Sequence, residues 1–279
     1  MAWFENKYRF DKSAIKIAHV TDCHLFEDNT GKYFSVNTAE NFQRTLNYLA
    51  TLELDAIVFG GDLTQDHTTA SYQLFAKLIT ASPLKAPVFW LPGNHDELQT
   101  LEEITEGQIL GAKHIQLEGA DVLLVNSKGH TPAGWCEKEH LSELKQVLLQ
   151  SSEQVLVFCH HHPLPINGYL DKHILENGPE LLNCLVNSGK VAGLIHGHVH
   201  NEYHYGYRAM SIVATPATSI QFSKCTEQWQ QQNLGPAVRI INLGAQVYDS
   251  EVIWLDGEFI FMASIAQRSH LKRSNLVSG

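Results

Sequence analysis

The chain has 279 residues, 44% of them hydrophobic, which is enough to build a large core in one domain or two. An aromatic fraction of 9% together with this apolar content excludes a mainly disordered chain. No apolar run approaches the ~20 residues of a membrane span, and the N-terminus lacks the basic and apolar regions of a secretory signal. We therefore expect a cytoplasmic protein that has no membrane partner.

Acidic residues outnumber basic ones by 30 to 20, which gives a formal net charge of −10. Proteins that bind nucleic acid neutralise phosphates with clustered lysines and arginines, and here such residues gather only in the tail at 268–273. Nucleic acid is therefore not an expected partner. The five cysteines are odd in number and show no C-x-x-C spacing, which argues against a disulfide framework and suits a reducing compartment.

Apolar strand patterns alternate with helical patterns along most of the chain. A strand is predicted over 14–21, and Asn37 with Glu40 predicts a capping box at the start of a helix. Further strands are predicted over 56–59, 88–91, 122–125, 155–159 and 191–195, and helices over 71–80, 139–149 and 179–187. Beyond 211 the pattern predicts only strands, over 211–214, 237–242 and 246–254. This order predicts one α/β domain over 1–279, with a core over about 14–255 and a tail from about 263 that we expect to be disordered.

Histidine is over-represented, with 16 residues, and half of these fall in four short segments that each follow a predicted strand. The segments contain His24, His95, the triplet 160–162, and the group His196, His198 and His200. Because sites in open α/β sheets lie beyond the carboxyl ends of the strands, these segments should converge. Each motif alone has a simpler explanation: Gly-Gly-Asp is a common turn, and Asp96 could cap a helix over 97–106. Their joint occurrence, in order and each at a strand end, favours one site.

The residue types in these segments favour metal binding. Carboxylate, imidazole and amide groups without sulfur suit manganese, iron or zinc better than calcium. Asp22/His24 and His198/His200 are i, i+2 pairs, which an extended segment presents on one side. With Asp62, Asn94 and one histidine of the triplet these pairs make seven ligands, too many for one tetrahedral ion. Seven fit two ions that share one carboxylate, for which the central Asp62 is the natural choice. Two such ions would leave a positive pocket that suits a phosphate, and water bound to them would ionise near neutral pH.

The sequence resembles the calcineurin-like metallophosphoesterase superfamily, whose five motifs are D-x-H, G-D, G-N-H-[DE], H and G-H-x-H. Here these motifs are Asp22-Cys23-His24, Gly61-Asp62, Gly93-Asn94-His95-Asp96, His161 and Gly197-His198-Val199-His200. The resemblance covers about 14–255 and implies a four-layer α/β/β/α sandwich with two divalent or mixed-valence transition metal ions. It implies that Asp22, His24 and His200 hold one ion, that Asn94, His161 and His198 hold the other, and that Asp62 bridges them.

The same resemblance implies roles for the remaining residues of the motifs. His95 is expected to be the catalytic acid and no ligand, and Asn94 and His95 are expected to contact the substrate phosphate. His161 is selected because the family's ligand usually lies two residues before the proline of this motif. His160 is then interpreted as a packing residue and His162 as support for a ligand. Gln65 stands where purple acid phosphatases carry a tyrosine, so a tyrosinate ligand is not expected.

Segments 91–96, 160–165, 214–222 and 235–242 together resemble bacterial class III 3′,5′-cyclic-AMP phosphodiesterases. This implies hydrolysis of the small molecule cyclic AMP to 5′-AMP by a hydroxide that bridges the metals, with His95 protonating the leaving oxygen. Alternatives on the same centre are a 2′,3′-cyclic nucleotide, a nucleoside diphosphate ester and a glycerophosphodiester, because loops 25–36 and 168–177 choose the substrate. A non-catalytic scaffold is a further alternative, which would be expected to have lost ligands. The oligomeric state and the metal's identity are left open.

Overall fold

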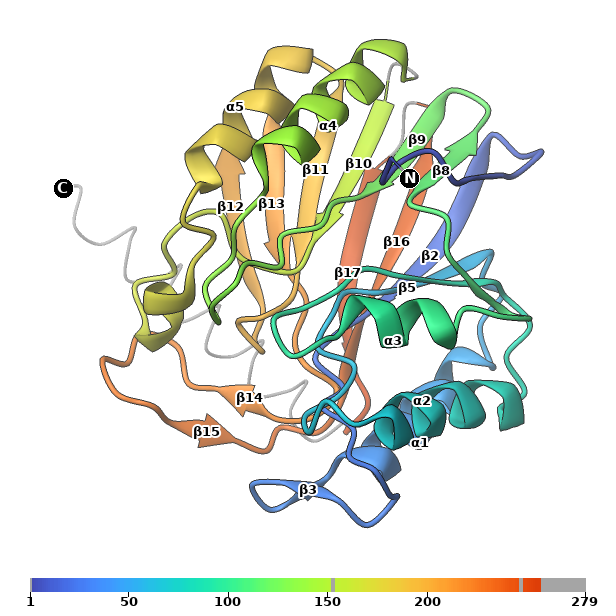
Figure 1. Cartoon of the computed structure of the whole chain (residues 1–279), viewed down its shortest axis with the longest axis vertical. Coiled ribbons are helices and arrows are strands. Elements are labelled where there is room, and N and C mark those ends of the chain that lie inside the picture. The colour runs from blue at the N-terminus through green and yellow to red at the C-terminus, as the bar shows by residue number, and fades with distance from the viewer. Residues whose placement is uncertain (1, 152–153, 246–247, 257–279) are drawn as a thin grey trace, which may run out of the picture.

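Two β-sheets packed face to face form the centre of the molecule in this computed structural model, which describes residues 2–151, 154–245 and 248–256 (Figure 1). Both sheets contain parallel and antiparallel strand pairs, because parallel strands joined through helices are extended by antiparallel strands. The seven-stranded sheet has the order β1 (Lys7–Arg9), β8 (His114–Leu117), β9 (Ala120–Leu124), β10 (Gln154–Cys159), β11 (Val191–His196), β13 (Met210–Ala214), β12 (Tyr203–Tyr207). The six-stranded sheet has the order β17 (Tyr248–Trp254), β16 (Ala237–Gly244), β2 (Ala14–Val20), β5 (Ala56–Phe59), β6 (Val88–Trp90), β7 (Ile109–Leu110).

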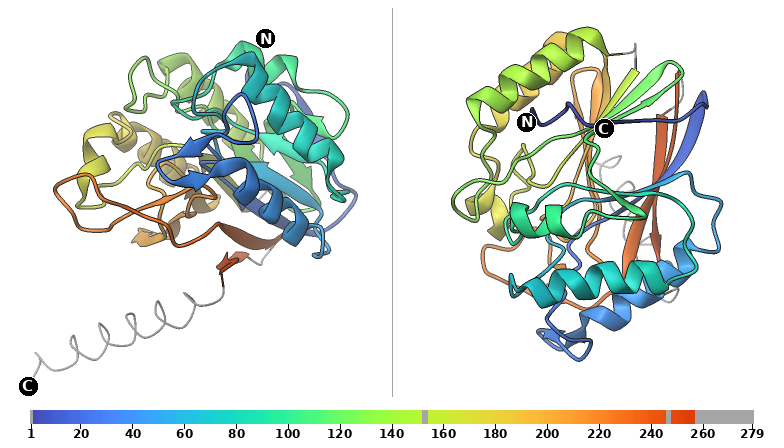
Figure 2. Two further views of the ribbon diagram at one scale, coloured as in Figure 1. Left: turned by 90° about the horizontal axis from the view of Figure 1, so that it is seen from below. Right: turned by 45° about the vertical axis from the view of Figure 1, so that its right-hand side comes forward.

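Helices cover the outer face of each sheet, as the two views of Figure 2 show. The six-stranded sheet is covered by α1 (Thr38–Leu49) and α2 (Thr69–Ala81), with the short α3 (Leu98–Glu103) beside them. The seven-stranded sheet is covered by α4 (Lys138–Gln150) and α5 (Gly178–Ser188). The predicted four-layer α/β/β/α sandwich is therefore confirmed.

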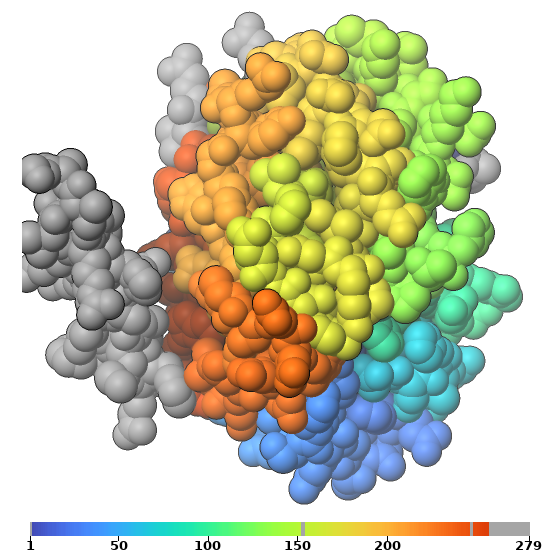
Figure 3. Space-filling model, turned by 90° about the vertical axis from the view of Figure 1, so that its left-hand side faces the viewer, coloured from blue at the N-terminus to red at the C-terminus, as the bar shows by residue number. Residues whose placement is uncertain are grey.

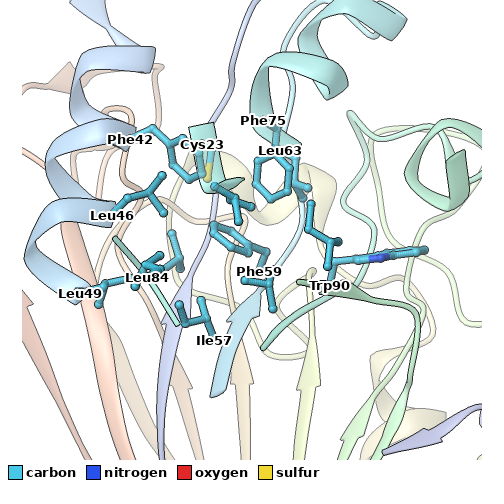
Figure 4. Packing of buried hydrophobic residues seen from close by; sticks show 14 of the residues in the cluster. Cys23, Phe42, Leu46, Leu49, Ile57, Phe59, Leu63, Phe75, Leu84 and Trp90 are labelled. Atoms are coloured by element: carbon cyan, nitrogen blue, oxygen red, sulfur yellow. The ribbon is translucent and has the colours of Figure 1, made fainter. Parts of the chain in front are cut away.

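The layers follow from side chains that alternate along the central strands. In β5, Ile57 and Phe59 pack toward α1 and α2, whereas Ala56 and Val58 face the other sheet. Strands buried on both faces are apolar throughout, which is why the apolar runs of the sequence predict them. Figure 4 shows the helix side of this core, where Phe42, Leu46 and Leu49 of α1 meet Phe59 and Phe75.

The boundaries predicted from the sequence agree with the structure to within a few residues at each element named there. Asn37 caps α1 as expected, because its side chain accepts a hydrogen bond from the Glu40 N–H. The strands predicted beyond residue 211 are divided between the two sheets. In the seven-stranded sheet β13 lies parallel to β11, whereas β16 and β17 extend the six-stranded sheet as antiparallel strands. The tail expected from about 263 lies outside the described residues.

Two short hairpins and a 3₁₀ helix that the sequence patterns did not predict lie at one end of the sandwich. They are β3 (Lys32–Tyr33) with β4 (Val36–Asn37), β14 (Gln221–Phe222) with β15 (Gln231–Gln232), and η1 (Tyr169–His173). This is the end at which the parallel strands finish (Figure 1). No helix within the described ranges is long and apolar enough to span a membrane.

Candidate metal centre

The predicted ligands follow the carboxyl ends of five parallel strands that belong to both sheets. Asp22 follows β2, Asp62 follows β5 and Asn94 follows β6, all in the six-stranded sheet, whereas His161 follows β10 and His198 follows β11 in the seven-stranded sheet. The loops are joined by backbone hydrogen bonds, such as that from the His24 N–H to the Asp62 carbonyl at 3.0 Å. The site therefore lies where the two sheets meet.

Most of the predicted ligands have a left-handed backbone. The φ angle is 54° at Asp22, 48° at His24, 51° at Asp62, 66° at His198 and 54° at His200. The two i, i+2 pairs thus reach the site through left-handed residues and not through the extended segment expected from the sequence. Non-glycine residues persist in this conformation where the surrounding structure enforces it, and such residues gather at functional sites.

Glycines next to the ligands allow the loops to approach each other closely. A Cβ atom on Gly93 would lie 2.1 Å from the Asp62 Oδ1 atom, and one on Gly197 would lie 2.8 Å from the Asp22 Oδ2 atom. Any larger residue at these two positions would displace a predicted ligand. This explains the glycines of the motifs around Asn94 and His198 in physical terms.

Asp22, His24 and His200 form one buried group whose ligand atoms lie within 4.8 Å of one another. The Nε2 atoms of His24 and His200 are 3.1 Å apart, and the Nε2 atom of His200 is 3.3 Å from Asp22 Oδ1. Burial lowers the pKa of His24 to about 3, so its imidazole is neutral, as a metal ligand must be. Cys23 between them faces the core (Figure 4), which leaves the donor set without sulfur.

Asp62 lies between the two halves of the site. Its Oδ2 atom is 3.7 Å from the Nε2 atom of His24 and 3.3 Å from that of His160, and its Oδ1 atom accepts the His95 N–H at 2.8 Å. Burial raises the pKa of this carboxyl, but the neighbouring His160 outweighs burial and holds the pKa well below the usual value. A central ionised carboxylate with histidines on two sides fits a bridging position.

His160, His161 and His198 form a second buried group whose candidate ligand atoms lie within 4.8 Å of one another, and Asn94 is the remaining predicted ligand. The Nε2 atoms of His161 and His198 and the Oδ1 atom of Asn94 are buried, and none of the three has a hydrogen-bond partner. Burial places the pKa of both histidines well below the usual value, so both offer a lone pair. Buried polar atoms are rarely left without a partner, and the rings of His161 and His198 lie 4.7 Å apart, so one cation would satisfy both nitrogens. The buried, unpartnered nitrogens of His161 and His198 therefore fit a metal ion.

His160 was interpreted from the sequence as a packing residue, but both of its ring nitrogens face polar partners. Its Nδ1 atom is 2.7 Å from the Gly60 carbonyl, and its Nε2 atom faces the carboxylate of Asp62. Burial disfavours the imidazolium, but Asp62 and Asp22 outweigh burial and raise the pKa of His160 to about 9. His162 lies on the other side, 3.4 Å from the carboxylate of Asp171, and its ring stacks on that of His198.

His95 lies at the open side of the site, half-buried, with its ring 5.2 Å from that of His24. The ring of His67 stacks on that of His95 at 5.4 Å, and Lys128 donates a hydrogen bond to the Asn94 carbonyl. Asp96 does not cap a helix, because α3 begins at Leu98 and the Asp96 carboxylate accepts the N–H groups of Gly93 and Leu63. Burial, followed by the charge of Asp62, raises the pKa of Asp96 to about 7.

Sequence reasoning missed several residues that surround the site. They are Tyr33, which stacks on His24 at 4.7 Å, and the pair His67 and Lys128 described above. No motif marks Tyr33 or Lys128 in the sequence. The position of His67, five residues after Asp62 in the same loop, was a signal that could have been used.

A model of the calcineurin-like phosphoesterase family matches residues 15–202. The chain belongs to this family. The phosphoesterase is 54% identical over 260 residues to a protein of Pseudoalteromonas sp. (strain SM9913) named a probable cyclic nucleotide phosphodiesterase, with 92% of this chain and 100% of that protein covered. It is 35% identical to a Haemophilus influenzae protein named 3′,5′-cyclic adenosine monophosphate phosphodiesterase CpdA, with 85% of this chain and 88% of that protein covered.

The fold is also that of a dimetal phosphatase from Danio rerio, with a TM-score of 0.57 at 12% identity, over 86% of this chain and 98% of that one. Family membership confirms the resemblance found in the sequence and the prediction of an enzyme. The phosphoesterase carries histidine and aspartate groups able to bind the metals on which this family depends.

Proposed function

We propose that this phosphoesterase hydrolyses 3′,5′-cyclic AMP to 5′-AMP at a centre of two transition metal ions, with iron, manganese or zinc as the preferred metals. The observation that supports it most is the full-length similarity to a probable cyclic nucleotide phosphodiesterase, in a chain that retains every predicted ligand. A scaffold that had lost catalysis would not be expected to keep the whole set.

One ion would be held by Asp22, His24 and His200, the other by Asn94, His161 and His198, with Asp62 shared. These ions would supply positive charge for the phosphate and a water that ionises near neutral pH. The unpartnered nitrogens of His161 and His198 support the second position. The two ionised carboxylates would neutralise part of that charge, so the centre would stay positive and attract an anion although the whole chain carries −10.

His95 would act as the acid that protonates the leaving 3′ oxygen. Its half-buried place beside Asp62 and His24 supports this role, because the ring can reach both solvent and a substrate at the centre. The hydrogen bond from its backbone N–H to Asp62 fixes its position relative to the metals. The Asn94 side chain, on the same short loop, would contact the phosphate beside it. The helix that follows has six residues and begins three residues later, so its dipole adds little here.

The test is a comparison of kcat/KM among phosphodiesters under matched Mn²⁺. Cyclic AMP should be the best substrate, or within about tenfold of the best, against 2′,3′-cyclic AMP, a glycerophosphodiester and a nucleoside diphosphate ester. The protein should bind two metal ions per chain by elemental analysis. A clear preference for another phosphodiester of the panel would refute cyclic AMP as the substrate, whereas the assignment to the phosphoesterase family would stand.

A further inference from the structure

We propose that Phe34 and Trp229 form a stacking platform for the nucleobase of the substrate. This inference rests on the proposed nucleotide phosphodiesterase function and adds the residues that would recognise the base. The metal centre can contact only the phosphate, so the base must be recognised elsewhere. Aromatic side chains bind flat bases by stacking, because every base presents a π-face.

Phe34 and Trp229 are exposed although large apolar side chains are usually covered. Among the described residues, the exposed large apolar side chains are Phe34 (46%), Trp229 (37%), Trp135 and Leu149. The rings of Phe34 and Trp229 lie 6.1 Å apart with a tilt of 36°. They come from the β3–β4 and β14–β15 hairpins, which lie against each other on the face shown in Figure 3, where the orange segment meets the blue one. Exposed aromatic pairs of this kind mark binding surfaces.

A closed series of ring contacts connects this pair to the metal centre. On one side, His24 stacks on Tyr33 at 4.7 Å, and Tyr33 contacts Phe34 at 4.8 Å. On the other side, His200 stacks on Phe222 at 4.1 Å, and Phe222 contacts Trp229 at 4.3 Å. Each exposed ring is thus separated from a predicted metal ligand by one aromatic residue. A base on the platform would therefore lie within reach of a phosphate at the centre.

The backbone at Phe34 supports a role outside folding. Tyr33 pairs with Val36, so Phe34 is the first residue of a two-residue hairpin turn, and its φ is 54°. Glycine or asparagine is preferred at such a position, whereas a bulky residue there is strained. The strained turn aims an exposed phenyl ring at Trp229. Tyr169 of η1 packs against Trp229 at 5.2 Å with nearly perpendicular ring planes and holds the second ring in place.

The sequence offers two other aromatic regions as candidates for base contact, 203–207 and 220–222, and the structure places both outside the exposed platform. Phe222, from the segment 220–222, lies beneath the platform and stacks on a predicted ligand. Tyr203 and Tyr205 stack on each other in the edge strand β12 and pack on the cluster of Ile166 and Leu170. These tyrosines buttress the loops and have no ring contact with Phe34 or Trp229 among the described residues.

The test compares two inhibitors that differ only in the base, 5′-AMP and ribose 5-phosphate, acting on hydrolysis of a nitrophenyl phosphodiester by the metal-loaded enzyme. In the wild-type protein, 5′-AMP should bind about 5- to 150-fold more tightly, which is the size of base stacking on an aromatic ring. The ratio of the two inhibition constants should fall toward one in Phe34→Gly and Trp229→Ala. Trp229→Phe should restore most of it.

Glycine suits the positive φ of this turn, so Phe34→Gly is expected to fold, and its Tm is compared with that of the wild type. Leu149→Ala, at a more exposed apolar position on α4, should keep the wild-type ratio, and metal content is measured for every variant. A wild-type ratio near one, or an unchanged ratio in both platform variants, would overturn the inference. If the ratio of inhibition constants falls in both platform variants but the wild-type enzyme does not favour cyclic AMP, the platform is supported and the proposed substrate is refuted.

Discussion

The three consecutive histidines 160–162 differ in what their ring nitrogens contact. Both nitrogens of His160 face partners, namely the Gly60 carbonyl and the Asp62 carboxylate. His161 is held through Nδ1 by Ser127 at 2.9 Å, and its Nε2 atom is buried without a partner. A metal-binding histidine is typically held in this way, with one nitrogen fixed by a neighbour and the other directed at the ion.

His161→Ala should therefore lower the metal content from two ions toward one per chain, because the ion shared with Asn94 and His198 loses a ligand. His160→Ala should retain more metal, since the change leaves the unpartnered nitrogens of His161 and His198 in place. Elemental analysis after dialysis against metal-free buffer measures both. Loss of the second ion in His160→Ala, with retention in His161→Ala, would show that the ligand lies one residue earlier.

His95→Ala should keep both metals and lose about 10²–10⁴-fold in kcat on cyclic AMP, because the leaving oxygen would no longer be protonated. The loss should shrink for a nitrophenyl phosphodiester, whose leaving group needs little protonation. Steady-state kinetics on the two substrates separates these outcomes. His67→Ala serves as the control that removes only the ring stacked on His95. Equal losses on both substrates would argue against an acid.

At the scale of elements, Trp3 of the N-terminal segment contacts both halves of the sandwich, because its ring also lies 6.5 Å from that of Trp90 in β6. The indole of Trp3 donates to the Leu124 carbonyl of β9, and the Trp3 and Phe4 N–H groups donate to Glu143 of α4. The Nζ atom of Lys113 lies beneath, buried, 3.0 Å from the centre of the Trp90 ring. Burial holds the pKa of this lysine well below its usual value.

The unfolded chain therefore binds the Lys113 proton more strongly than the folded chain does. It follows that the free energy of unfolding should rise with pH between the lowered pKa and the ordinary lysine value of about 10.4. Lys113→Met should flatten this rise and stabilise the fold near pH 7, because the methionine carries no charge to be buried. Urea unfolding of metal-loaded protein at several pH values measures it, with exposed Lys145→Met as the control. A slope unchanged in Lys113→Met would contradict this account.

The long elements were predictable from the sequence because each leaves a periodic or continuous apolar pattern. Strand β10 is buried on both faces and reads as an apolar run, whereas β3, β7 and β14 contain two residues each and leave no pattern. The predicted ligands were marked by motifs at strand ends. Phe34 and Trp229 were not, because they meet through two hairpins that lie far apart in the sequence.

At the scale of the whole molecule, the candidate centre ties one sheet to the other. Asp22, Asp62 and Asn94 follow strands of the six-stranded sheet, and His161 and His198 follow strands of the seven-stranded sheet. An ion held by both groups stabilises the folded chain by mass action, since the unfolded chain lacks the assembled site. Metal binding and the packing of the two halves should therefore be coupled.

Removal of the metals with a chelator should lower Tm by roughly 5–10 °C, the shift expected for a stabilisation of about 2.7 kcal/mol at 100 times Kd in a chain of this size. Mn²⁺ should restore Tm in a concentration-dependent way, and Mg²⁺ should restore it less, because imidazole ligands favour transition metals. Differential scanning calorimetry with parallel metal analysis checks this. An unchanged Tm in protein shown to be metal-free would refute the coupling.

The left-handed backbone of the predicted ligands also bears on how this fold can diverge. Five ligands occupy φ angles between 48° and 66°, a region that costs a residue with a side chain about 1–2 kcal/mol relative to glycine. A descendant freed from catalysis would gain stability by exchanging these ligands for glycine, so mutation would erase the metal motifs quickly. The left-handed backbone therefore makes the metal motifs costly to keep once the metals are lost.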